Sequence, residues 1–347
     1  MNVSSIGNYN NLNYNYKKEK NPLSHSYIQN IGLVNKPDKL YKKINNNLYN
    51  VYFGVKNKPK KHNANFSQEI RLALRNIVVN KQQLINHTST SVDKWLQQFE
   101  DKDKLMALKL LDNFEYISLN SARSIFKNLH MKLLSQKNFN LDKTFFSYFG
   151  EAKSGGLMAY LYSQAVGFRE KGKAYKANNT NKKFYSFSTL EEASMFDKLK
   201  KQGKDTMVIV DDIIDNGESA SEFLTESAIK ALNTFNKIYY ITLFSNQKGI
   251  NKIKSLLPNV EFMSYKNIQK YDDKNSALYD NKDEIYNFIR KYSLKIEPDK
   301  IEKYKNSKIF ITFDWNTPGN TPMPFSYEKK DVWKCLFRRY NGLIDNG

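Results

Sequence analysis

The stretch that decides the fold is VIVDDIIDNGES, residues 208–219. It begins as an apolar strand, carries two adjacent acids, Asp211 and Asp212, and turns at Gly217 into a segment of helical character. In an open α/β sheet, ligands bind beyond the carboxyl ends of the strands. A turn that enters a helix presents free backbone N–H groups, which suit a phosphate. The stretch therefore predicts a site for a phosphorylated ligand at the end of a buried strand.

A diol beside the phosphate completes the expected ligand. Asp211 and Asp212 stand just before the turn, where their carboxylates can accept hydrogen bonds from vicinal hydroxyls. Ser219 adds a hydroxyl donor after the turn. A phosphate and a diol at this separation describe a ribose 5-phosphate.

These residues resemble the motif that binds 5-phosphoribosyl 1-pyrophosphate (PRPP) in type I phosphoribosyltransferases. The resemblance implies that Asp211 and Asp212 bind the ribose 2′- and 3′-hydroxyls, and that they contact Mg²⁺ weakly, through those hydroxyls or water. It also implies that the turn wraps the 5′-phosphate. The residues of this expected phosphate loop are Asp215, Asn216, Gly217, Glu218 and Ser219.

Two positions of the loop depart from the family pattern, and a third has two possible roles. Asn216 stands where Thr is usual in the family, and Glu218 places an acid beside the phosphate unless its side chain points outward. Asp215 matches the position that acts on the purine ring in hypoxanthine phosphoribosyltransferases. In this chain Asp215 either has that catalytic role or shapes the turn.

A second stretch, KTFFSYFGEAKSGGLMAYLYSQA (143–165), resembles the same family's pyrophosphate loop between its first strand and helix. Glycines let the backbone approach the pyrophosphate, and a lysine offsets its charge. The residues expected to bind pyrophosphate are Lys153, Ser154, Gly155 and Gly156, with Ser154 as an extra residue relative to the family pattern. The polar stretch 169–188 then takes the place of the family's flexible hood, and we expect a mobile loop there.

Strands and helices alternate from residue 143 to residue 265, which predicts a doubly wound, parallel α/β sheet. We expect a helix directly after the glycines, over 157–168, and another over 218–235. Residues 1–64 form a basic Asn/Lys-rich arm with little apolar periodicity, and residues 65–140 form a helical region. The α/β domain then covers 141–347, including an extension from about 296.

The segments KWLQQF (94–99), EAKSGGLMAYLY (151–162) and NTPGNTPMPF (316–325) resemble phosphoribosyltransferase-like proteins of bacterial conflict and antiphage systems, some of them linked to retrons. That resemblance implies an effector role and a protein partner. The last segment is either an acceptor pocket or a loop made rigid by its prolines. In the first case its contacts are Asn316, Thr317 and Asn320, with Trp315 or Phe325 as stacking faces.

The charge of the chain is a weak guide to function. The net charge is +20, but only seven of the 55 cationic residues are Arg, the residue that reads phosphates and base edges best. Nucleic-acid binding by the basic arm remains one alternative, and a solvated tail is the other. One Cys and four scattered His exclude a disulfide framework and Cys-based or HExxH-type zinc sites. With no apolar run of membrane-spanning length, we expect a soluble, cytoplasmic protein.

The sequence thus favours an enzyme: Mg²⁺-dependent transfer or cleavage of ribose 5-phosphate at C1, with release of pyrophosphate. Asp211, Asp212 and Asp215 would favour the positive charge that develops on the ribose. A base, a nucleotide, a tRNA or a protein is each compatible as acceptor, and the family resemblance implies a homodimer. The alternative is a non-catalytic module that binds PRPP or a related nucleotide and regulates a protein partner.

Overall fold

The computed structural model of the chain describes residues 68–149, 154–167, 184–187, 199–300 and 307–339. The arm 1–64, Lys153 and residues 168–183 lie outside these ranges. The helices are α2 (Gln68–Asn80), α3 (Gln82–Asn86), α4 (Val92–Leu96), α5 (Lys104–Asp112), α6 (Leu119–Leu134), α7 (Ser154–Ala165), α9 (Glu218–Phe223), α10 (Glu226–Leu232), α11 (Gln247–Leu256), α12 (Lys282–Ile296) and α14 (Met323–Ser326). The strands are β1 (Glu115–Ile117), β2 (Thr144–Phe149), β3 (Phe184–Phe187), β4 (Thr206–Ile214), β5 (Lys237–Ser245), β6 (Val260–Asn267) and β7 (Ile311–Phe313).

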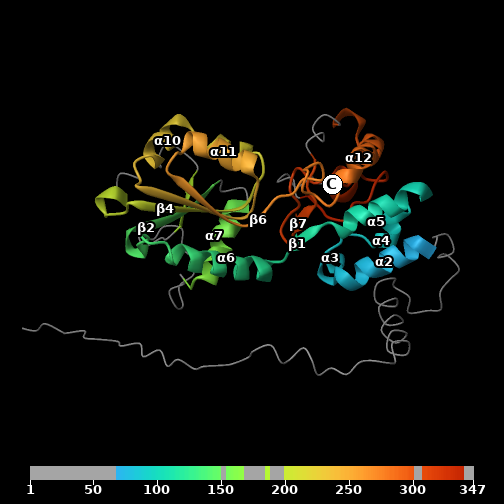
Figure 1. The fold of residues 1–347 in the computed structure, drawn as a ribbon, viewed down its shortest axis with the longest axis horizontal. Helices are drawn as coiled ribbons and strands as arrows, with labels where there is room; N and C mark the ends of the chain where they lie inside the picture. Colours follow the sequence, from blue (N-terminus) through green and yellow to red (C-terminus); the bar gives the residue numbers. More distant parts are fainter. Residues whose placement is uncertain (1–67, 150–153, 168–183, 188–198, 301–306, 340–347) are drawn as a thin grey trace, which may run out of the picture. The chain divides into compact units, whose positions relative to one another are not determined.

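The main sheet has five parallel strands in the order β3-β2-β4-β5-β6. Helices α10 and α11 lie on one side of this sheet, and α6 and α7 lie on the other (Figure 1). This arrangement confirms the doubly wound α/β fold. Parallel strands need helical crossovers, and those crossovers cover both faces of the sheet.

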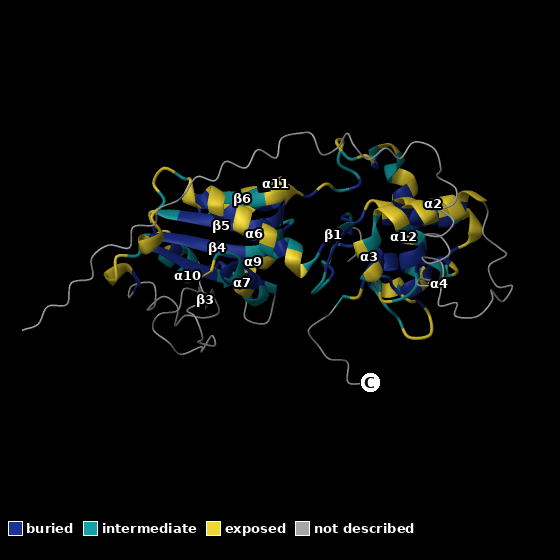
Figure 2. Cartoon of the chain, turned by 90° about the horizontal axis from the view of Figure 1, so that it is seen from below, coloured by how far each residue is buried: buried dark blue, intermediate teal, exposed yellow. Residues whose placement is uncertain are grey.

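The core of the sheet follows from the alternation of side chains along its strands. In β4, Val208 and Val210 pack in the hydrophobic cluster that contains α6 and α7, whereas Met207 and Ile209 pack in the cluster that contains α9, α10 and α11. All four are fully buried, and β4 and β5 are drawn mostly as buried strands in Figure 2. Burial on both faces explains why this segment is continuously apolar up to its two acids.

Two helices differ from the expectation. Helix α7 begins at Ser154 and ends at Ala165, so the glycine pair belongs to its first turn and does not precede it. The segment 218–235 forms two short helices, because α9 ends at Phe223 and the hydroxyl of Thr225 then accepts a hydrogen bond from the backbone N–H of Ala228, at 3.3 Å. A threonine at this position favours a new helix start.

The stretch expected to be a mobile hood contains part of the sheet. Residues 184–187 form strand β3, which pairs in parallel with β2 in the register Phe146↔Phe184. The run FYSF has the aromatic content typical of a strand, and the polar residues around it mask that signal in the sequence.

A second, two-stranded parallel sheet joins segments from opposite ends of the described chain. Strand β1 pairs with β7, with Glu115 opposite Ile311 and Ile117 opposite Phe313. These two strands were not predicted, since three-residue strands carry no detectable periodicity. The sheet links the helical region to the carboxyl-terminal extension.

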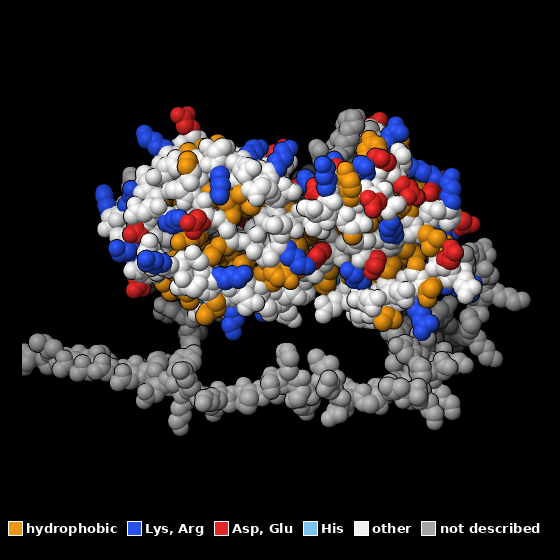
Figure 3. Space-filling view, viewed as in Figure 1, with side chains coloured by type: hydrophobic (Ala, Val, Ile, Leu, Met, Phe, Trp, Pro, Cys, Tyr) orange, Lys and Arg blue, Asp and Glu red, His pale blue; other side chains and the backbone are white. Residues whose placement is uncertain are grey.

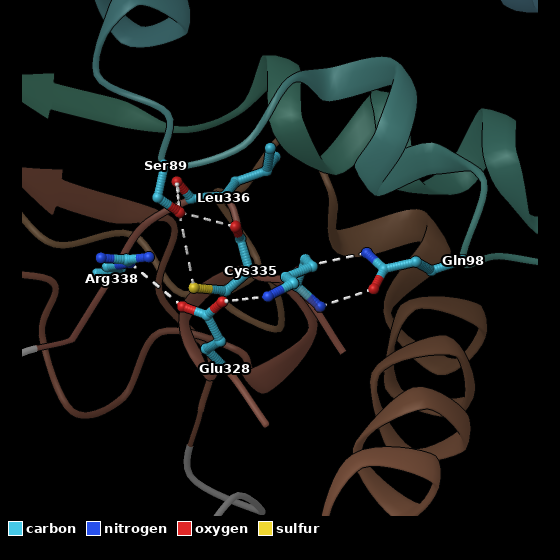
Figure 4. A network of polar contacts seen from close by, with 7 residues as sticks. Ser89, Gln98, Glu328, Cys335, Leu336 and Arg338 are labelled. Atoms are coloured by element: carbon cyan, nitrogen blue, oxygen red, sulfur yellow. Dashed lines mark hydrogen bonds and ion pairs between the residues drawn. The ribbon is translucent and has the colours of Figure 1, made fainter. Parts of the chain in front are cut away.

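Polar contacts reinforce this link (Figure 4). The hydroxyl of Ser89 donates hydrogen bonds to the carbonyl oxygens of Cys335, at 2.8 Å, and Leu336, at 3.1 Å. The Gln98 amide exchanges two hydrogen bonds with the backbone of Lys334, at 2.9 and 2.7 Å. Cys335 is buried there, which raises the pKa of its thiol to about 11, so it is an inert structural thiol at neutral pH.

Among the described residues, no helix combines the length and the apolar character that a membrane crossing requires. On the face shown in Figure 3, the Lys and Arg side chains are dispersed among acidic and neutral ones. That face of the described chain therefore carries no continuous basic stripe of the kind that follows a nucleic-acid backbone.

Candidate active site

The strand order places the candidate site at the carboxyl ends of β2 and β4. The chain leaves β2 toward β3 on one side, whereas β4, β5 and β6 follow on the other side. A change of direction of this kind is a topological switch point, where open α/β sheets bind their ligands. Both loops singled out in the sequence end at this point, since α7 follows β2 and the turn 215–217 follows β4.

The first loop depends on a close approach at Gly155. A Cβ atom at this position would lie 2.2 Å from the carbonyl oxygen of Phe149, the last residue of β2. Only glycine lets the start of α7 pack so tightly against the strand. At Gly156 the nearest atom would be Cε2 of Tyr148 at 3.6 Å, an ordinary contact. Lys153, the expected counter-charge, lies outside the described residues.

Asp211 and Asp212 form a hydrogen-bonded acid pair at the end of β4. Their carboxyl groups hydrogen-bond to each other, and the backbone N–H of Asp212 donates to Asp211 Oδ1 at 2.9 Å. The hydroxyl of Tyr240 on β5 donates to Asp211 Oδ2 at 2.7 Å. Burial and the neighbouring carboxylate of Asp212 raise the pKa of Asp211 to about 8. Burial and the neighbouring carboxylate therefore favour the protonated form of Asp211 at neutral pH.

Asp212 receives its own set of donors. The indole Nε1 of Trp315 donates to Asp212 Oδ2 at 3.2 Å, and the hydroxyl of Ser154 also hydrogen-bonds to this carboxylate. Burial still raises the pKa of Asp212 above its ordinary value. Because Ser154 belongs to the first loop, the structure brings the two sequence motifs together around one carboxylate.

Asp215 is engaged by two side chains from later in the chain. Its carboxylate forms a 2.9 Å ion pair with the ammonium of Lys270, and its Oδ2 accepts a hydrogen bond from the amide of Asn320. The side chain of Asp215 is only 8% exposed. Lys270 therefore neutralises the third acid of the motif.

The turn after Asp215 has the geometry of a tight loop. Asn216 Oδ1 accepts a hydrogen bond from the backbone N–H of Glu218, at 3.1 Å. Gly217 has a φ of 76°, in the left-handed region that favours glycine. Glu218 and Ser219 are exposed in the first turn of α9.

A second glycine, Gly249 of α11, packs against this turn. A Cβ atom on Gly249 would lie 2.6 Å from the carbonyl oxygen of Asp215 and 3.0 Å from the backbone nitrogen of Gly217. Sequence reasoning missed Gly249. In the structure Gly249 lies in the first turn of α11 (Gln247–Leu256), and a lone glycine in a helix usually has a packing reason.

Five residues of the carboxyl-terminal loop 315–325 were proposed to contact a ligand, and two of them hydrogen-bond to the acids of the motif. Trp315 and Asn320 reach Asp212 and Asp215, as described above. Phe325 is fully buried among Trp95, Phe114 and Phe310, so it is not a stacking face for a ligand. Thr317 is buried and hydrogen-bonds to Thr312 at 2.9 Å, and Asn316 Oδ1 accepts from the backbone N–H of Thr317.

Two further contact residues, Tyr240 and Lys270, were not identified from the sequence. Tyr240 lies within an apolar strand and Lys270 within a polar segment, and no local pattern marks either of them. Tyr240 reaches Asp211 because β5 pairs with β4. Lys270 reaches Asp215 from the segment that follows β6.

The acid pair can supply only some of the ligands of an ion such as Mg²⁺. Among the described residues, no group of three or more His, Cys, Asp or Glu side chains is arranged to hold a metal by itself. Asp211 and Asp212 supply oxygen donors, the ligand type that Mg²⁺ prefers. A cation at the pair would favour the ionised form of both carboxyl groups. These residues therefore suit a Mg²⁺ ion that takes most of its ligands from a phosphorylated compound.

Comparisons with known proteins place the chain in a family. No curated protein matches the chain. One similar solved structure, the AQ2163 protein from Aquifex aeolicus, has 13% sequence identity and a TM-score of 0.29 over 51% of this chain and 81% of that chain. A likeness this distant carries no argument. The model of the PRTase-CE family matches residues 92–339, more than two thirds of the chain, and spans every described residue of the site. The chain belongs to the PRTase-CE family.

Proposed function

We propose that the chain binds PRPP together with Mg²⁺ at the carboxyl ends of β2 and β4, and that it transfers or cleaves the ribose 5-phosphate at C1. The observation that carries the proposal is the Asp211–Asp212 pair at the end of β4, where Ser154 at the start of α7 hydrogen-bonds to Asp212 and the turn with Gly217 follows directly. Each hydroxyl of a diol both donates and accepts a hydrogen bond. A carboxylic acid beside a carboxylate matches that requirement.

The loops supply the remaining contacts in this proposal. The turn 215–219 would hold the 5′-phosphate with backbone N–H groups, and Ser219 would add its hydroxyl. Ser154, Gly155 and Gly156 would face the pyrophosphate, with Lys153 as its counter-charge. Exposed Glu218 can point away from the phosphate, which reduces the expected repulsion.

The chemistry would be a substitution at C1 of the ribose. The bond between C1 and the pyrophosphate oxygen breaks, pyrophosphate leaves, and a nucleophile or water forms the new bond. Bound Mg²⁺ would stabilise the negative charge of the departing pyrophosphate. The carboxylate of Asp212 would favour the positive charge that develops on the ribose, and the described side chains otherwise act by positioning.

A second candidate function is a non-catalytic PRPP- or nucleotide-binding module that acts on a protein partner. The observation that favours it is the ion pair between Asp215 and Lys270, because it occupies the acid expected to act on an acceptor. In either form, the resemblance to conflict-system proteins supports a role as an antiphage effector.

The two candidates differ in product formation. Wild-type protein is incubated with Mg²⁺ and PRPP labelled in its ribose, with and without cell extract, and both pyrophosphate release and transfer of the label are measured. Enzyme function predicts release above the rate without protein. Tight PRPP binding without pyrophosphate release in either condition would exclude the enzyme and support the non-catalytic binding module. Absence of PRPP binding would contradict both.

A further inference from the structure

A cavity of about 450 Å³ lies apart from the acid pair. Its walls come from residues 266–269, residues 276–278 and the starts of β1 and β7, with Phe244 of β5 behind them. Asp211, Asp212 and Asp215 do not line it. The volume falls within the range of small-molecule sites, which is roughly 300 to 1,000 Å³.

Three aromatic residues line the cavity. Phe244, Tyr271 and Phe310 line it, and these residues are 1%, 4% and 6% exposed. Buried rings of this kind favour flat, aromatic ligands over flexible polar ones.

The charged residues that line the cavity carry no net charge. The ammonium of Lys266 contacts both carboxylate oxygens of Glu115 at 2.8 Å, so these two charges neutralise each other. The amide side chains of Asn267 and Gln269 also line the cavity, and neither hydrogen-bonds to another residue in the described part of the chain. An amide offers one donor and one acceptor side by side, the pattern that pairs with the edge of a nucleobase.

We infer that this cavity binds a neutral, planar nitrogen heterocycle of nucleobase size. The aromatic side chains contact its faces, and the amides of Asn267 and Gln269 pair with its edge. A phosphate or carboxylate is disfavoured because the lining cation is already paired. The next residue after Gln269 is Lys270, the partner of Asp215, so the cavity adjoins the candidate active site through one step of backbone. Binding here requires neither PRPP nor Mg²⁺, so the inference does not rest on the proposed function.

Equilibrium dialysis of the full chain, with labelled adenine, hypoxanthine, cytosine and uracil and without PRPP or Mg²⁺, tests the inference. At least one base is expected to bind with a Kd below about 1 mM. Gln269→Ala removes the exposed amide and should weaken that base about tenfold, the value of one good amide–base pair. Ala277→Trp, at an exposed residue of the wall, fills the cavity and should abolish binding. Gln247→Ala, an exposed amide on α11 outside the cavity, should change nothing.

Three results would overturn the inference. The first is that none of the four bases binds. The second is that the Gln269→Ala variant binds the base as tightly as the wild type does. If the Ala277→Trp variant does not fold, Gln269→Ala alone tests whether the base binds in this cavity. The third is that a base binds only when PRPP is present, which would place it as an acceptor at the acid pair. PRPP binding is measured on the same preparations, so failure of this inference and failure of the proposed function are separate outcomes.

Discussion

The indole Nε1 of Trp315 donates a 3.2 Å hydrogen bond to the carboxylate of Asp212. This contact connects the carboxyl-terminal extension to the acid pair of β4. The indole also stacks on Phe313 of β7, with ring centroids 4.6 Å apart and planes at 7°. The residue between them, Asp314, is fixed by hydrogen bonds from Tyr116 and from the backbone N–H of Leu119. The β1–β7 sheet therefore positions a donor for the candidate active site.

Replacement of Trp315 by Phe tests this positioning. The variant keeps a ring to stack on Phe313 but loses the indole N–H, so the pKa of Asp212 should rise further. A hydrogen bond to a charged group contributes about 1.5 kcal/mol or more, so PRPP–Mg²⁺ affinity should fall about tenfold. Calorimetric titration measures it. Unchanged affinity would show that the contact has no part in binding.

The close approach at Gly155 predicts that an alanine there lowers the stability of the fold, whereas an alanine at the adjacent Gly156 does not. Gly155→Ala forces a Cβ against the carbonyl oxygen of Phe149 and should lower the free energy of unfolding by about 2 kcal/mol. Gly156→Ala meets only the ring of Tyr148 at 3.6 Å and serves as the matched control. Urea denaturation measures both variants. Equal losses for the two would contradict the packing described for α7.

The acid pair predicts a distinctive dependence of stability on pH. The pKa of Asp211 is raised to about 8 in the folded chain, above its ordinary value of about 3.9 in the unfolded chain. The stability that this group contributes is complete below about pH 4 and is lost as the pH rises through 8. The loss approaches at most about 1.4 kcal/mol per pH unit within that window.

Asp211→Asn mimics the protonated side chain and should remove this component. Urea unfolding of the wild type and the variant at several pH values between 5 and 8 measures it. The variant should gain stability relative to the wild type as the pH rises. A constant difference between the two proteins over this range would contradict the raised pKa of Asp211.

Gly249 is predicted to act on the phosphate turn through packing alone. Gly249→Ala places a Cβ against the backbone of Asp215 and Gly217, so the turn must shift. Backbone N–H groups of the turn that are displaced from the 5′-phosphate bind it more weakly, so PRPP affinity should fall about tenfold or more. Gly319→Ala is the control, because a Cβ there has no neighbour within 4 Å. Equal affinities for both variants would mean that the turn does not bind the phosphate.

The main sheet was predictable because its strands carry a local signal. Strand β5 is the apolar run KIYYITLFS (237–245), and the segment 208–219 contains the end of β4, the turn and the start of α9. Buried parallel strands are continuously apolar, and the acids stand out at their ends. Sequence alone was therefore enough to locate Asp211, Asp212 and Asp215 at one edge of the sheet.

The partners of these acids were harder to predict, because they depend on contacts between distant segments. Tyr240 meets Asp211 across neighbouring strands, Lys270 meets Asp215 across 55 positions, and Trp315 meets Asp212 across 103. None of these pairs has a local pattern. The prediction that Trp315 or Asn320 contacts a ligand remains a prediction, but the structure places both beside the acids.

Binding of PRPP by the Asp211–Asp212 pair is measured by calorimetric titration of PRPP with Mg²⁺ into the wild type and the Asp211→Asn/Asp212→Asn double variant. Asp142→Asn, an exposed acid at the amino end of β2, is the matched control. Circular dichroism confirms that each protein is folded. PRPP should bind to the wild type and to the control, and it should not bind to the double variant. Undiminished PRPP binding by the folded double variant would contradict binding by the acid pair.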